Sequence, residues 1–295
     1  MRRALRLVLL LACASMGWTL PAAATPLTDA IKNADVATVQ ALIAKGANVN
    51  EMEGGIAPLG LSLGAKALNS AAVEGGQAGA KDQAAAFDAV TKLLLDRGAN
   101  PNALVQNGSY AELAPMYNAL GMEPTPLSWS LWAIDPSSAA LLIEHGAHVH
   151  PNALVLLEFA VLGREGGEHP YTEKFYADLD SRAGTAARLL IEKGAKLVGS
   201  ASAKGVVRPQ VALLGFAQSL CVGTTGLLIE HGADVNGVIE KGPAKAKLLK
   251  TLEDDYANEN VQRKDAGFSR EAWNLINARQ VAIMQLLIAH GAKEQ

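Results

Sequence analysis

The chain has 295 residues, of which 49% are hydrophobic and 19% charged, and its formal net charge is −3. This composition excludes a wholly disordered protein, because disorder requires low hydrophobicity and high net charge. A pI near 6.1 argues against a nucleic-acid-binding protein, which normally carries a basic surplus. The two cysteines, Cys13 and Cys221, are too few for a disulfide framework or a cysteine-rich zinc module.

The first 24 residues have the pattern of a secretory signal peptide. A basic head precedes the apolar run 7–12, and small residues end the segment at 22–24. This order predicts cleavage after Ala24 and a periplasmic mature chain, 25–295. Removal of the three arginines of the leader leaves 23 basic and 29 acidic side chains, a net charge of about −6.

The same segment has an alternative interpretation as a lipoprotein signal. Residues 10–13 (Leu-Leu-Ala-Cys) match a lipobox, which would leave Cys13 lipidated at the outer membrane after a leader of only 12 residues. The mature N-terminus distinguishes the two interpretations, because cleavage after Ala24 removes Cys13. No later stretch holds 18 uninterrupted apolar residues, so no integral membrane segment is predicted in the mature chain.

A motif of seven residues recurs along the rest of the chain. Residues 141–147 (Leu-Leu-Ile-Glu-His-Gly-Ala) return unchanged at 227–233, and four similar copies occur. The glycines of these six copies are Gly46, Gly98, Gly146, Gly194, Gly232 and Gly291. Paired aliphatic residues face a core and the glycine adopts a left-handed conformation, so each copy predicts the end of a helix. Such regular recurrence indicates a repeat protein.

Matching helix starts stand 21 residues before two of these glycines. They are the segments Thr25-Pro26-Leu27-Thr28 and Thr125-Pro126-Leu127-Ser128, in which Thr suits the N-cap and Pro the first helical position. Together with the Leu-Leu-x-x-Gly-Ala helix ends, these motifs resemble the ankyrin repeat over nearly all of the mature chain. The resemblance implies an all-α ankyrin-repeat solenoid of stacked helix-loop-helix units, and recognition of proteins rather than catalysis.

The resemblance divides residues 25–295 into six repeats with insertions. Their predicted bounds are about 25–50, 57–102, 125–150, 151–198, 211–236 and 270–293. Successive helix-ending glycines are 38 to 59 residues apart, which is longer than the usual ankyrin period. Helical stretches are predicted within the insertions at Ala111–Leu120 and Ala244–Tyr256. Insertions of this kind often lie on the binding face of a repeat array.

The sequence offers no recognisable catalytic or metal-binding motif. Gly-x-Ser-x-Gly, a phosphate loop, His-Glu-x-x-His and paired cysteines are all absent. His145, His148 and His150 form the tightest polar cluster, but no carboxylate or thiolate accompanies them. We therefore predict no catalytic residue, no metal ligand and no cofactor.

Apolar and aromatic residues near one predicted groove are candidates for binding a partner. Counting from Thr125, Trp129 and Trp132 hold the two positions of a first helix that face the groove in ankyrin folds. Equivalent positions and the neighbouring insertion add Leu61, Leu156, Phe159, Tyr110 and Tyr117. Aromatic anchors in an apolar centre are typical of a binding hot spot. In the alternative interpretation the segment 101–124 covers this patch, and the tryptophans belong to the core.

The sequence thus predicts a periplasmic module that holds a partner protein in its groove. An inhibitor, an immunity protein or a protective factor for a periplasmic enzyme or toxin fits this description, and the negative charge favours a basic partner. One alternative is an envelope scaffold anchored through lipidated Cys13. Another is an enzyme whose site the insertions build, around His169, Tyr171 and Asp180.

Overall fold

The computed structural model describes residues 25–74, 76–79, 82–105, 108–165, 171–203, 206–241, 244–265 and 268–293. The predicted signal peptide, Cys13 and His169 lie outside these residues. The chain forms two compact units, unit 1 (Met1–His150) and unit 2 (Pro151–Gln295). No helix in the described part of the chain has the length and hydropathy needed to cross a membrane.

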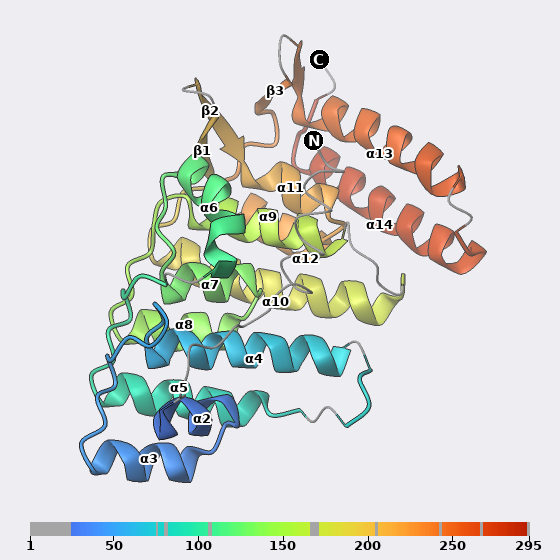
Figure 1. Ribbon diagram of the computed structural model, residues 1–295. Coiled ribbons are helices and arrows are strands. Elements are labelled where there is room, and N and C mark those ends of the chain that lie inside the picture. The colour runs from blue at the N-terminus through green and yellow to red at the C-terminus, as the bar shows by residue number, and fades with distance from the viewer. Residues whose placement is uncertain are drawn as a thin grey trace. The chain divides into compact units, whose positions relative to one another are not determined.

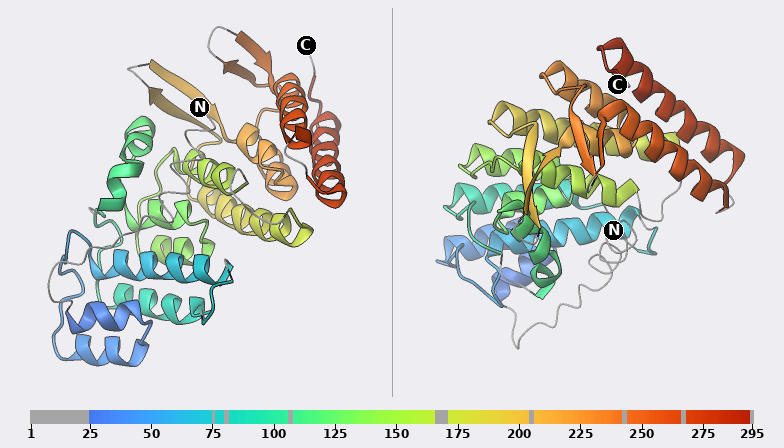
Figure 2. Two further views of the ribbon diagram at one scale, coloured as in Figure 1. Left: turned by 45° about the vertical axis from the view of Figure 1, so that its right-hand side comes forward. Right: turned by 90° about the horizontal axis from the view of Figure 1, so that it is seen from above.

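Unit 1 is built from pairs of helices, and its described residues form three such pairs (Figures 1 and 2). The pairs are α2 (Pro26–Lys32) with α3 (Val36–Ala44), α4 (Pro58–Glu74) with α5 (Ala84–Asp96), and α7 (Pro126–Trp132) with α8 (Pro136–Glu144). The first helices pack in one row, α2 on α4 on α7, and the second helices in another, α3 on α5 on α8. The additional helix α6 (Gly108–Leu120) confirms the helix predicted in the insertion before Thr125.

Unit 2 repeats this two-row arrangement and adds two β-hairpins. Its pairs are α9 (Ala153–Glu165) with α10 (Glu173–Glu192), α11 (Ala212–Gln218) with α12 (Val222–Glu230), and α13 (Leu248–Asp265) with α14 (Arg270–Ala289). The rows are α9, α11, α13 and α10, α12, α14. The hairpins are antiparallel, β1 (Val198–Ala203) with β2 (Val206–Val211) and β3 (Val238–Lys241) with β4 (Ala244–Lys247).

The last repeat differs from its prediction. We expected two helices within 270–293, but α14 is one continuous helix, and its partner is α13. Residues 270–289 contain neither Gly nor Pro, so nothing ends the helix before Gly291. The helix predicted to start at Ala244 begins at Leu248 instead, because 244–247 form β4.

The six repeated glycines end helices as predicted. All six have positive φ, from 85° at Gly291 to 97° at Gly46. The following residue then donates back into the helix, as the amide of Ala147 does to the carbonyl of Leu142 at 2.9 Å. These bonds satisfy carbonyl groups that the end of a helix would otherwise leave unpaired.

The turn inside three repeats contains a left-handed residue other than glycine. These residues are Ala34, Ile134 and Leu220, with φ of 54°, 52° and 61°. Glycine would adopt this conformation more readily, but all three side chains are buried in the core. Burial of the side chain therefore offsets the backbone strain and holds the two helices of the repeat at a close turn.

Asparagine side chains connect consecutive repeats. Each of these asparagines stands four residues after a helix-ending glycine. Its side-chain amide donates to the backbone carbonyl of the helix-ending glycine of the next repeat. Its side-chain oxygen accepts from the backbone amide of the residue two positions after that second glycine. The donated bonds are Asn50 to Gly98 (2.9 Å), Asn102 to Gly146 (3.0 Å) and Asn236 to Gly291 (3.0 Å). These bonds keep neighbouring turns in register.

Candidate protein-binding surface

Most of the predicted groove residues are buried. Trp129 is only 7% exposed, and Leu61, Leu156 and Tyr117 are also in the core. Trp132 and Phe159 are partly exposed, and the side chain of Tyr110 lies outside the described residues. The buried residues stabilise the fold, and the expectation that they form exposed anchors is wrong.

The packing of the first helices explains why these residues are buried. α7 has seven residues, and six of them are buried, so that Trp132 is its main exposed side chain. α9 packs against α10, α11 and β1, which leaves little of its surface for a partner. Counting positions along a helix identifies one face of it, but the neighbouring elements decide whether that face is open.

Exposed hydrophobic residues occur between repeats, as well as on the helices α4, α13 and α14. Met52, Leu104 and Val238 are 48%, 36% and 53% exposed, and each lies six residues after a helix-ending glycine. We call Met52 and Leu104 of unit 1 the finger residues. The sequence analysis did not identify these exposed residues. Counting from the helix-ending glycine of each repeat would have shown that Met52, Leu104 and Val238 occupy the same position.

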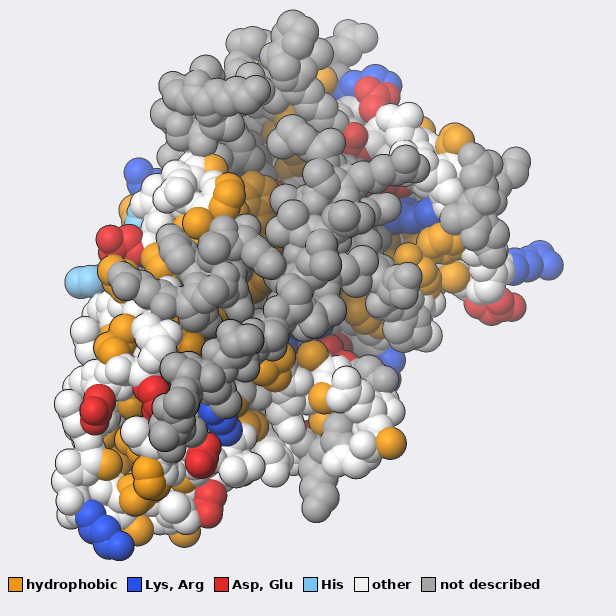
Figure 3. Space-filling view, viewed as in Figure 1, with side chains coloured by type: hydrophobic (Ala, Val, Ile, Leu, Met, Phe, Trp, Pro, Cys, Tyr) orange, Lys and Arg blue, Asp and Glu red, His pale blue; other side chains and the backbone are white. Residues whose placement is uncertain are grey.

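The finger residues lie in consecutive turns. The amide of Asn100 donates to the side chain of Asn50 at 2.8 Å, which joins the turn before Met52 to the turn before Leu104. Figure 3 shows hydrophobic side chains in several separate groups along this edge of unit 1. A partner protein that covers exposed apolar side chains at one repeated position removes their surface from water.

The turn that carries Met52 is acidic. Glu51 is exposed, whereas Glu53 accepts hydrogen bonds from the side chains of Thr28 and Thr25. The hydrogen bond from the Thr28 hydroxyl lowers the pKa of Glu53 despite the opposing effect of burial. Glu51 is therefore the solvent-facing carboxylate beside the exposed methionine, and a basic surface would complement it.

The densest polar cluster of unit 1 centres on Lys66. Its ammonium group donates to Asp88 (2.5 Å), Asp135 (3.0 Å), Ser137 (2.8 Å) and Ser138 (3.3 Å), and its side chain is 7% exposed. Burial would raise the pKa of Asp135, but the charge of Lys66 and the hydrogen bonds outweigh it and lower that pKa. All donors of the ammonium group have internal acceptors, so the cluster links α4, α5 and α8 rather than offering a site to a substrate.

The histidine cluster is not arranged as a metal site. Nδ1 of His145 lies 2.8 Å from the carbonyl oxygen of Leu141, and Nε2 lies 3.1 Å from Oδ1 of Asp96. Both ring nitrogens thus have partners within the protein. No three His, Cys, Asp or Glu side chains in the described ranges are grouped so that they could hold a metal ion.

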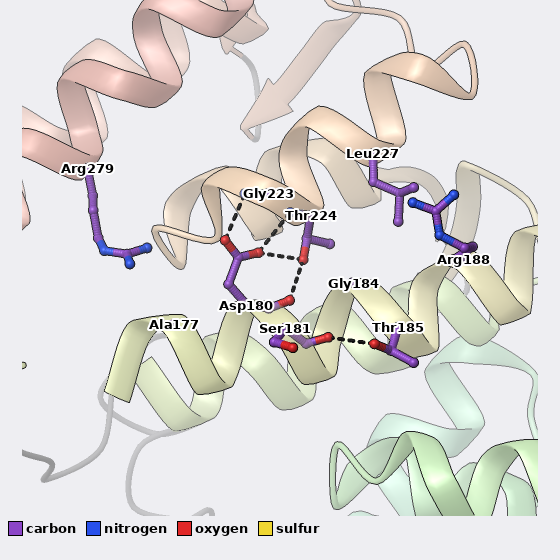
Figure 4. A pocket seen from close by; sticks show the side chains of 10 residues that line it. All are labelled: Ala177, Asp180, Ser181, Gly184, Thr185, Arg188, Gly223, Thr224, Leu227 and Arg279. Atoms are coloured by element: carbon purple, nitrogen blue, oxygen red, sulfur yellow. Dashed lines mark hydrogen bonds between the residues drawn. The ribbon is translucent and has the colours of Figure 1, made fainter. Parts of the chain in front are cut away.

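An open pocket of about 470 Å³ lies between α10, α12 and α14 of unit 2 (Figure 4). Asp180 in its wall accepts from the amides of Gly223 (2.7 Å) and Thr224 (2.8 Å). Arg279 donates to Glu173 at 2.5 Å and to the carbonyl of Leu220 at 3.1 Å. Asp180 and Arg279 therefore hold helices of unit 2 together.

Comparison with known proteins identifies the fold. No family model matches the sequence, and no curated protein matches it. The structure is similar to the ankyrin repeat domain of Bcl-3, a unique member of the IkappaB protein family, with a TM-score of 0.51 at 17% identity over 92% of this chain and 87% of that chain. This likeness supports an ankyrin-repeat fold and confirms the predicted fold class.

Two further solved structures are more distant. The human ASB11 ankyrin repeat domain has 16% identity and a TM-score of 0.39, covering 92% of this chain and all 100% of that chain. The ankyrin repeat protein EF0377 has 15% identity and a TM-score of 0.32, covering 70% and 96%. The likeness to the Bcl-3 domain, at 17% identity, concerns the fold and leaves the partner open.

Proposed function

We propose that this chain is a periplasmic protein-binding module that holds a partner protein on its turns and the adjoining groove. The observation that carries the proposal is the exposure of Met52 and Leu104 at one repeat position in consecutive turns. A partner that covers these side chains removes apolar surface from water on both proteins, which is the main favourable contribution to association. Trp132, which is partly exposed, is the remaining aromatic candidate in unit 1.

Export is supported by the leader at residues 1–24. Cleavage after Ala24 releases the module into the periplasm, whereas lipidation of Cys13 would anchor it at the outer membrane as a scaffold. The mass of the mature N-terminus separates these two possibilities directly.

A basic protein is the proposed partner. The mature chain carries about −6, and Glu51 is exposed next to Met52. Opposite charges accelerate association and exclude wrong partners. A cell-wall hydrolase or a toxin fits this chemistry, and the module would act on it as an inhibitor, an immunity protein or a protective factor.

The experiment compares the finger residues with matched exposed residues elsewhere. Proteins retained from periplasm by the wild-type chain are identified by mass spectrometry, and the affinity of each purified partner is measured by calorimetry. Met52→Ser with Leu104→Ser should weaken binding about 30-fold to 1,000-fold, because hot-spot residues contribute roughly 1–2 kcal/mol each. Val281→Ser with Ile288→Ser removes two side chains of α14 that are at least as exposed, at 52% and 57%, and should leave the affinity unchanged.

Two results would contradict the proposal. If the wild-type chain retains no protein from periplasm at mild salt, the proposed protein-binding function is contradicted. Equal affinity in the finger variant and the wild type would show that binding does not use these turns.

A further inference from the structure

We propose that Glu53 is the built-in binding site for the chain's own amino terminus, created when the leader is removed between Ala24 and Thr25. This inference rests on the export proposed above. It assigns Glu53 a role in completing the first repeat after processing, which is separate from partner binding.

The proposed step is a hydrolysis by the peptidase that removes secretory leaders. Water is the co-reactant: its oxygen joins the carbonyl carbon of Ala24 to form a carboxylate, and the C–N bond to Thr25 breaks. The nitrogen of Thr25 takes up the released protons and becomes an ammonium group. The Thr25 nitrogen thus changes from a neutral amide with one N–H into a positively charged ammonium group with three.

The geometry for receiving this cation exists in the structure. The nitrogen of Thr25 lies 3.4 Å from Oε2 of Glu53, and the hydroxyl of Thr25 donates to the same oxygen at 3.2 Å. The hydroxyl of Thr28 also donates to it. Charged donors form shorter and stronger hydrogen bonds than amides, so the weak contact at Thr25 should become an ion pair.

The backbone holds Glu53 in place. Its amide donates to the carbonyl of Ile56 at 3.0 Å, and the amide of Ile56 donates back at 3.1 Å. This tight turn directs the carboxylate towards α2, although 28 residues separate it from Thr25 in the chain. The Thr28 hydroxyl lowers the pKa of Glu53, so the carboxylate is charged at neutral pH.

The new ammonium group needs a counter-charge because of where it forms. Thr25 is the N-cap of α2, and its side chain accepts from the amide of Thr28. A positive charge at this end opposes the helix macrodipole. Asp29 lies in the first turn but is exposed, and Lys32 adds a further positive charge, which leaves Glu53 as the carboxylate bonded to Thr25.

The test is a cycle of four chains measured by thermal unfolding. Two of the chains begin at Thr25, and one of these carries Glu53→Gln. The other two begin at Ala22, and again one of them carries Glu53→Gln. In the chains that begin at Ala22, Thr25 keeps a neutral amide, so the substitution reports only the hydrogen bonds to the two threonines. We expect Glu53→Gln to lower the Tm by about 2–4 °C more in the chain that begins at Thr25.

Glu51→Gln is the matched control, since it removes an exposed carboxylate two residues away. It should change the Tm equally and slightly in both backgrounds. An equal loss for Glu53→Gln in both backgrounds would overturn the proposal, because the charge on Thr25 would then have no part in it.

The mass of the chain recovered from the periplasm separates this inference from export. A chain that begins at Thr25 supports both proposals. A periplasmic chain cleaved at another bond, or one lipidated at Cys13, overturns the role of Glu53 but leaves export standing. An uncleaved chain that stays in the cytoplasm overturns both.

Discussion

Asp180 and Thr224 are joined by three hydrogen bonds between neighbouring repeats of unit 2, one of which runs from the Thr224 hydroxyl to the backbone carbonyl of Asp180 at 3.1 Å. Oδ1 of Asp180 accepts from the backbone amide of Thr224 at 2.8 Å and from its hydroxyl at 2.7 Å (Figure 4). α12 requires this contact because its own N-cap residue, Cys221, makes no side-chain capping bond. In α3 and α8 an aspartate at that position, Asp35 or Asp135, caps the helix locally.

Loss of Asp180 should therefore destabilise unit 2. We expect Asp180→Ala to reduce the free energy of unfolding by about 1–2 kcal/mol, measured with urea, because the first turn of α12 loses its acceptor. Cys221→Ser should recover about 0.5–1 kcal/mol in that background, since serine is a good N-cap of similar size. Asp178→Ala, on the exposed side of α10, is the control. Equal effects of the two aspartate substitutions would contradict the capping role.

Lys66 should be the most sensitive charged residue of unit 1. Lys66→Met leaves two partly buried carboxylates without their cation, so the expected loss of stability is about 3 kcal/mol. The exposed pair of Lys92 and Asp96 is the control, and Lys92→Met should cost at most about 0.5 kcal/mol.

The pH dependence of this effect follows from Asp135. Its folded pKa is lowered, so its contribution is present above the ordinary value of 3.8 and is lost as pH falls through the folded pKa. The difference between wild type and Lys66→Met should consequently shrink in acid. A difference that stays constant with pH in urea titrations would contradict the ion-pair explanation.

His145 should titrate above an ordinary histidine. The hydrogen bond with the Leu141 carbonyl, followed by that with Asp96, raises the pKa of His145 above 6.5. Its stabilising effect is therefore complete below pH 6.5 and is lost as pH rises through the folded pKa. In an NMR titration, Asp96→Asn should lower this pKa only in part, because the larger contribution comes from the backbone. Asp82→Asn, at the other end of α5, should leave it unchanged.

Glu158 is a buried acid that the fold tolerates at a cost. It is 6% exposed, burial raises its pKa well above 4.5, and its Oε2 has no hydrogen-bond partner in the part of the chain that the structure describes. Glu158→Met should raise the free energy of unfolding at pH 7 by about 1–2 kcal/mol. The gain should shrink as pH falls towards 4.5, because the wild type then carries the neutral acid in both states.

Gly215 on α11 gives an independent test of where Glu158 lies. A Cβ atom at Gly215 would come within 2.1 Å of Oε1 and Cγ of Glu158, so Gly215→Ala should destabilise unit 2. Combining it with Glu158→Ala should remove most of that penalty. If the two losses simply add in urea unfolding, the side chains do not meet as described.

The regular features of this fold follow from the sequence because they depend on neighbours in the chain. Gly46 and Gly146 end helices through their own φ, and Thr125 with Pro126 starts one through local hydrogen bonding and a restricted backbone. One departure from the prediction also has a local cause. Residues 270–289 contain neither Gly nor Pro, which accounts for the unbroken helix α14.

Only the tertiary structure decided which side chains remain available to a partner. Trp129 and Leu156 occupy helix positions that the ankyrin pattern leaves open, yet they are buried, whereas Met52 and Leu104 in the turns are exposed. Likewise, nothing near Cys221 in the chain indicates that Asp180 caps its helix. Exposure and pairing of this kind depend on elements that are distant in sequence, since burial is a property of the whole packed unit and not of a helix alone.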